Sequence, residues 1–152
     1  MHCFNWKEYK MRSDILNQNS QQTGGKKLKL VNVTVDITLT NDDSGKVYAC
    51  ESSGGAVAIT LPTTLEDGVY YKFVVWEETP TADITIAAGS AIISGVNKDA
   101  GGDAANSTAG TQISNVILDT TAQRGDWVNF VAVNGEWVVE AFSSINNGIQ
   151  TS

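Results

Sequence analysis

The chain has 152 residues, which is enough for one domain with an apolar core and too few for two domains of ordinary size. Charged residues make up 18% of it and glycine occurs 14 times, a composition that excludes a coiled coil, a highly charged disordered chain and a collagen-like repeat. Two cysteines, Cys3 and Cys50, are too few for a disulfide-dense scaffold. A reduced pair is the simplest interpretation, and a disulfide or a metal site stays open.

The net charge of −7 is divided unevenly along the chain. Residues 1–30 hold six basic and two acidic groups, whereas residues 31–152 hold four basic and fifteen acidic groups. An acidic body repels the phosphates of nucleic acids, so we expect no nucleic-acid partner. No apolar run reaches the ~20 residues of a membrane helix, and the first residues lack the apolar stretch of a secretory signal. We therefore expect a soluble protein made in a cytoplasm, without a membrane partner.

Residues 1–26 show no strand periodicity, and we expect an extended N-terminal arm and linker there. The polar residues 17–25 have the composition of a flexible linker. Residues 8–16 favour one short helix, which is marginal in water unless it packs on something. The arm's large apolar side chains either dock onto a partner or fold back on the chain's own core, and both interpretations stay open. These side chains are Phe4, Trp6, Tyr9, Met11, Ile15 and Leu16.

Residues 27–152 are expected to form one β domain. Over residues 31–40, valine, isoleucine and leucine alternate with polar residues, which predicts one strand with one buried face. Further strands are predicted over residues 46–50, 57–61, 69–76, 83–87, 112–118, 127–133 and 136–142, with a shorter apolar piece at 91–94. Both faces of 69–76 carry apolar side chains, so this strand is expected to be central. Pro62 lacks a backbone N–H for the sheet, so it is expected to end the strand before it or to lie at a sheet edge.

Turn signals separate these segments. Asn134-Gly135 is the strongest short hairpin signal, because both central residues of a type I′ turn need positive φ. Residues 95–111 have no core-forming pattern and are expected to form an exposed, mobile loop. About eight or nine short strands with one weak helix candidate predict an all-β protein, built as a compact antiparallel β-sandwich or barrel.

The sequence offers no set of residues for nucleophilic catalysis or zinc binding. The single histidine, His2, lies beside the start of the chain, where a Ser-His-Asp or Cys-His site has no preorganised partner. His2, Cys3 and the distant Cys50 are one ligand short of a convincing zinc set. We therefore expect no enzymatic activity, no metal and no cofactor.

Acidic residues form several small groupings, each with a structural interpretation that we favour. The adjacent carboxylates at 42–43 and 77–78 fall in predicted turns and do not face each other across a glycosidase cleft. Asp99 and Asp103 lack the Asp-x-Asp-x-Asp-Gly spacing of a calcium loop. Residues 124–126 spell Arg-Gly-Asp, the tripeptide of some adhesion proteins, but they are also typical of a polar turn before a strand.

Six stretches of the β domain stand in a characteristic order. They are Leu39-Thr40-Asn41-Asp42-Asp43-Ser44-Gly45-Lys46-Val47-Tyr48, Ile59-Thr60-Leu61-Pro62, Gly68-Val69-Tyr70-Tyr71-Lys72-Phe73-Val74-Val75, Ile84-Thr85-Ile86 with Ile93-Ser94-Gly95, Gly125-Asp126-Trp127-Val128, and Asn134-Gly135-Glu136-Trp137. As an ordered set over roughly residues 38–150, they resemble the β-rich virion structural proteins of tailed bacteriophages, especially head decoration or cement proteins. The resemblance implies a small sandwich or barrel on the capsid exterior. It also implies a homotrimer that binds the major capsid protein, stabilises its lattice and has no catalytic residues.

The arm lies outside the part that carries the resemblance, so its role is inferred from composition. Buried aromatic side chains contribute ~1.5–3 kcal/mol each before ordering costs, and basic groups complement an acidic partner surface. The candidate contacts with the capsid or another partner are Phe4, Trp6, Tyr9, Lys26, Lys27 and Lys29.

An alternative function is a tail-fibre, baseplate or head-fibre module that binds host-surface carbohydrate. Trp6, Tyr70, Trp76 and Trp127 could offer flat faces on which sugars stack. We favour ordinary core packing for these aromatic side chains.

Overall fold

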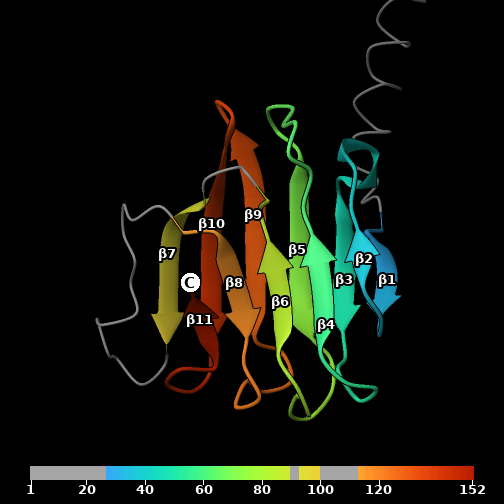
Figure 1. Ribbon diagram of the computed structural model, residues 1–152, viewed down its shortest axis with the longest axis vertical. Helices are drawn as coiled ribbons and strands as arrows, with labels where there is room; N and C mark the ends of the chain where they lie inside the picture. Colours follow the sequence, from blue (N-terminus) through green and yellow to red (C-terminus); the bar gives the residue numbers. More distant parts are fainter. Residues whose placement is uncertain (1–26, 90–92, 100–112) are drawn as a thin grey trace, which may run out of the picture.

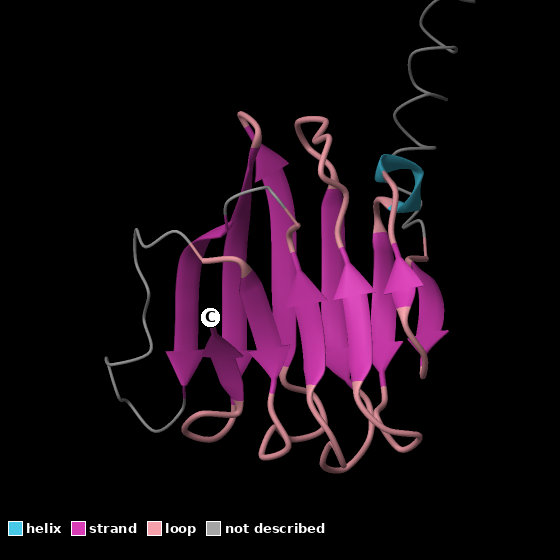
Figure 2. Ribbon diagram, in the orientation of Figure 1, coloured by secondary structure: helices cyan, strands magenta, loops and turns pink. Residues whose placement is uncertain are grey.

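The computed structural model describes residues 27–89, 93–99 and 113–152. Eleven strands form two mixed sheets that face each other (Figure 1). Among the described residues the only helix is one 3-10 turn, Asn41–Asp43 (Figure 2), and no helix there is long and apolar enough to cross a membrane. The expected all-β class is confirmed.

The six-stranded sheet is called sheet A and the five-stranded sheet is called sheet B. In spatial order, sheet A consists of β1 (Lys29–Val33), β3 (Lys46–Cys50), β5 (Tyr70–Val75), β9 (Trp127–Val133), β10 (Glu136–Ser143) and β7 (Ile93–Asp99). Sheet B consists of β11 (Ile149–Thr151), β8 (Asn115–Leu118), β6 (Ile84–Ala87), β4 (Val57–Thr60) and β2 (Ile37–Thr38). Within the described ranges neither sheet closes on itself, so the two layers stay open.

The first six strands alternate between the two sheets, so the chain winds as a flattened coil (Figure 1). Each strand runs parallel to its equivalent one turn later: β1, β3 and β5 in sheet A, and β2, β4 and β6 in sheet B. Ile37, Ile59 and Ile86 share one register position across sheet B. The expected antiparallel pairing is therefore wrong for this half, because successive turns of a coil run in the same direction.

The later strands pair mainly antiparallel, as expected for a sandwich. The hairpin of β9 and β10 turns at Asn134, with φ 51°, and Gly135, with φ 80°, which confirms the predicted turn. Strand β5 lies between β3 and β9, which confirms that it is central. The exception is β7, which pairs parallel with β10 at the far edge of sheet A.

Three strand predictions are corrected by the structure. The strand expected over residues 31–40 is divided between the sheets by a bend at 34–36, where Asp36 Oδ1 accepts a hydrogen bond from Ala58 N–H at 2.8 Å. Residues 95–99 belong to β7 instead of a loop, because they pair with β10, and the rest of that expected loop from residue 100 lies outside the described residues. Strand β11, paired with β8, was not predicted.

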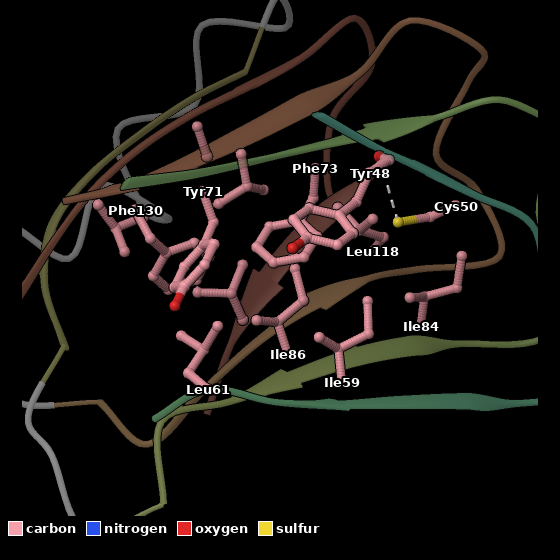
Figure 3. Packing of buried hydrophobic residues seen from close by; sticks show 14 of the residues in the cluster. Tyr48, Cys50, Ile59, Leu61, Tyr71, Phe73, Ile84, Ile86, Leu118 and Phe130 are labelled. Atoms are coloured by element: carbon pink, nitrogen blue, oxygen red, sulfur yellow. Dashed lines mark hydrogen bonds between the residues drawn. The ribbon is translucent and has the colours of Figure 1, made fainter. Parts of the chain in front are cut away.

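One apolar core fills the space between the sheets (Figure 3). Sheet A contributes aromatic rings: the Phe73 ring centroid lies 5.2 Å from that of Tyr48 and 5.7 Å from that of Phe130. Sheet B contributes aliphatic side chains, including Ile59, Ile84, Ile86 and Leu118, all fully buried. The core is therefore aromatic on one side and aliphatic on the other.

Cys50 lies in this core, and its burial raises the pKa of the thiol to about 12. Only a thiolate attacks disulfide reagents readily. In a Cys3→Ser variant, we expect Cys50 to react with Ellman's reagent at pH 8 at least about 100-fold more slowly in the folded protein than in urea. Equal rates in the two conditions would show that the thiol is accessible in the folded state. Cys3, its potential disulfide partner, lies outside the described residues.

Candidate interaction surface

The face of sheet A that points away from the core exposes large apolar side chains. Burial alternates along β9 and β10, so every second residue projects outward. The exposed fraction is 42% for Val133, 45% for Val138 and 39% for Phe142. Exposed apolar side chains that gather on one face are typical of an interaction surface.

The outward face of sheet B has a different character. Its outward positions are mainly threonine, alanine and amide residues: Thr38, Ala58, Thr60, Thr85, Ala87, Asn115 and Gln150. The larger Ile117 is only partly exposed there. The two faces of the molecule are therefore unequal, and sheet A carries the better candidate for a contact.

Charged and amide groups lie among the apolar side chains of sheet A. Lys72 on β5 is paired in register with Asn129 on β9, which is paired with Glu140 on β10. The Lys72 Nζ lies 5.0 Å from the centroid of the Trp127 ring, and Tyr70 Oη donates a hydrogen bond to Asn129 Oδ1 at 3.2 Å. The outer patch is defined by the outward residues of three rows: Tyr70, Val131 and Val138; Lys72, Asn129 and Glu140; and Val74, Trp127 and Phe142.

A second surface lies at the free side of β1, the edge strand of sheet A. Strand β1 pairs only with β3 among the described strands. Leu28 is 61% exposed and Leu30 63% exposed, and Lys27 and Lys29 beside them are also exposed. These four residues are called the β1 edge. They combine apolar area with positive charge in a chain whose net charge is −7.

The structure places only some of the predicted contact residues. Phe4, Trp6, Tyr9 and Lys26 lie outside the described residues, as does the rest of the expected arm. Lys27 and Lys29 lie at the β1 edge. The exposed Leu28 and Leu30 were not predicted as contacts, although their alternation with the two lysines is visible in the sequence.

The aromatic residues of the carbohydrate-binding alternative differ in exposure. Tyr70 is half-buried and Trp127 is covered on one side by a lysine of the outer patch. Trp76 is 55% exposed, with the Arg124 guanidinium 5.7 Å from its ring centroid. Trp6 lies outside the described residues. None of the three described rings belongs to the core, so the preferred core-packing interpretation is wrong for them.

The adjacent carboxylates hold turns together more than expected for solvated groups. Asp43 pairs with Lys46, and this hydrogen bond, with others from Thr40, lowers the pKa of the Asp43 carboxyl to about 2. Glu77 Oε1 accepts hydrogen bonds from the N–H and the hydroxyl of Ser52, the latter at 2.8 Å. Both pairs lie in turns or bends as predicted, and one member of each has a structural role.

The Arg-Gly-Asp tripeptide is confirmed as a turn. Asp126 is 1% exposed. Its Oδ2 accepts a hydrogen bond from Gln123 N–H at 3.0 Å, and its Oδ1 accepts one from Ser144 N–H at 2.8 Å. A carboxylate held in this way faces the protein interior and is not presented to a partner.

In the described ranges, no three His, Cys, Asp or Glu side chains lie close enough to hold a metal ion. Asp99 ends β7, and Asp103 lies outside those ranges. A shallow depression of about 390 Å³ lies at the bend between β1 and β2, lined by residues 34–36 and 54–56. No protein-family model matches the chain, and no curated protein shows significant similarity to it.

Proposed function

We propose that the chain is a virion structural protein that binds the outside of a tailed-bacteriophage capsid and stabilises the lattice of the major capsid protein. The ordered strand and turn motifs suggest this class, and the observation that carries the proposal is the β1 edge. At this edge, two leucines that are each more than 60% exposed alternate with two lysines. The edge follows directly after residues 1–26, in which basic residues outnumber acidic ones. The β domain acts as a sandwich that presents this edge to the capsid.

The chemistry of the β1 edge suits a protein partner. An edge strand has unpaired backbone N–H and C=O groups, so an extended segment of another chain can pair with it. Burial of Leu28 and Leu30 contributes ~1.5–3 kcal/mol each before ordering costs. Lys27 and Lys29 complement acidic groups on the capsid. Of the candidate contacts of the arm, Lys26 directly precedes this edge, and the linker of residues 17–25 joins the edge to Phe4, Trp6 and Tyr9.

The action is mechanical, and the partners are the major capsid protein and further copies of the chain as a homotrimer. Several weak contacts made by one oligomer add up to a high avidity when their geometry allows simultaneous binding. The protein is made in the host cytoplasm and resides on the capsid exterior. It acts without nucleic acid or membrane.

The test uses purified phage heads that lack the protein. The full-length chain is expected to bind them saturably and to raise the temperature at which they release DNA. A Leu28→Glu/Leu30→Glu double variant is expected to bind at least about tenfold more weakly in a co-sedimentation assay, because the two side chains can no longer be buried without desolvating charge. Val35→Glu is the matched control, since Val35 is 67% exposed at the bend after β1.

Two results would overturn the proposal. Equal binding of heads by the double variant and the wild type would exclude the β1 edge as the contact. Absence of the protein from mature virions, with binding on a glycan array, would favour the carbohydrate-binding alternative.

A further inference from the structure

We propose that copies of this chain associate through the outer patch of sheet A, around a rotation axis that runs along β9. Lys72 of one copy then lies beside Glu140 of the next copy. The inference deepens the proposed function, and rests on it, by naming the surface on which one copy meets another. The β1 edge lies in the same sheet, two strands from Lys72, and is not part of the outer patch.

The arrangement of charges on the outer patch is symmetric about β9. Lys72 and Glu140 occupy the same row of the sheet, one strand to either side of Asn129. Neighbouring strands lie about 4.8 Å apart, so the backbone positions of Lys72 and Glu140 stand at equal distances from the central strand. A rotation axis along β9 exchanges the β5 side of one copy with the β10 side of the next. Each Lys72 therefore meets a Glu140, whether the axis relates two copies or three.

The apolar rows of the patch match under the same rotation. Trp127 on β9 is paired in register with Val74 on one side and Phe142 on the other. One row further along, Val131 lies between Tyr70 and Val138. The rotation places Phe142 of one copy against Val74 of the next. It also places Val138 against the next Tyr70, so that apolar side chains meet apolar side chains in both rows.

The mixture of charges favours a second copy as the occupant of the patch. Two copies with a net charge of −7 each repel one another at long range, so association requires specific opposite-charge pairs at the contact. The mirrored positions of Lys72 and Glu140 supply two such pairs between two copies, or one pair at each contact among three copies. A uniformly acidic or basic partner would match only one of the two charges, whereas a self-complementary surface satisfies both.

The test is a charge exchange in the full-length chain, followed by sedimentation equilibrium. The wild type is expected to have the mass of two or three chains. Lys72→Glu and Glu140→Lys each place like charges together at the contact, and each is expected to raise the dissociation constant at least about tenfold. The double variant Lys72→Glu/Glu140→Lys restores opposite charges and is expected to return to within about threefold of the wild type.

A matched control variant and a parallel binding assay distinguish a change in association from a change in folding or in capsid binding. Thr85→Glu introduces a charge on the outward face of sheet B and is expected to leave the mass unchanged. A monomeric wild type, or a double variant as dissociated as the single variants, would overturn the inference. Co-sedimentation with heads is measured in parallel. If the oligomer stays intact but does not bind heads, this result contradicts the proposed function and does not contradict the outer-patch contact.

Discussion

Replacing Phe73 with alanine is expected to lower the free energy of unfolding by about 3–5 kcal/mol. Phe73 is fully buried at the centre of sheet A, and its ring contacts those of Tyr48, Tyr71 and Phe130. Removing the ring loses its transfer free energy and leaves a cavity that β5, paired on both sides, cannot close by moving. Urea unfolding followed by circular dichroism measures the loss.

Phe142→Ala is the matched control for this prediction, because it makes the same chemical change on the opposite face of the same sheet. Phe142 is 39% exposed, and the centroid of its ring lies 6.4 Å from the centroid of the Trp127 ring. At concentrations low enough to keep copies apart, it is expected to cost about 1 kcal/mol. Similar costs for the two variants would show that the face of sheet A assigned to the core is wrong.

The two-residue alternation predicted most strands because it reports which face is buried. It could not reveal the bend at residues 34–36. Val33 in sheet A and Leu39 after β2 both point into the one core, so odd-numbered residues stay apolar on both sides of the bend. Only Val35, 67% exposed at the bend itself, departs from the pattern. The alternation therefore continues unbroken while the chain passes from one sheet to the other.

The parallel pairing of successive turns could not be predicted either, because buried and exposed residues alternate in the same way in parallel and antiparallel strands. A clue existed in the repeated pattern Val-x-Ile-Thr-Leu at residues 35–39 and 57–61. These segments lie side by side in successive turns.

Strand β7 was missed for another reason. Its Gly95, Asn97, Lys98 and Asp99 have low strand propensity, and pairing with β10 overrides that preference.

The candidate surfaces were predicted in part. Charge pointed to Lys27 and Lys29, because six basic groups gather in the first 30 residues. The outer patch was not predicted, since apolar side chains on both faces of a strand are typical of burial on both faces. That inference was right about the central position of β5, but β10 also has Val138 and Phe142 on its outward face. The pattern of apolar residues is the same for a sheet face that the chain itself covers and for a sheet face that is left exposed.

The buried carboxylate of Asp126 joins the segment before β9 to the end of β10. It accepts hydrogen bonds from Gln123 N–H before β9 and from Ser144 N–H after β10. Ser143 Oγ lies 3.1 Å from Asp126 Oδ2, and Ser143 is fully buried. Because all these partners can donate, a carboxylate fits the position better than an amide does.

Asp126→Ala is therefore expected to lower the free energy of unfolding by about 3–5 kcal/mol, since the partly buried N–H groups of Gln123 and Ser144 lose their acceptor and each unsatisfied group costs about 1–3 kcal/mol. Asp126→Asn keeps the shape but turns an NH₂ group toward those donors, so an intermediate loss of about 2 kcal/mol is expected. Asp42→Ala, at an exposed position, is the control and is expected to change stability by no more than about 0.5 kcal/mol. Urea unfolding of the three variants at neutral pH makes the comparison. A loss below about 1 kcal/mol for Asp126→Ala would mean that water reaches these donors when the carboxylate is removed.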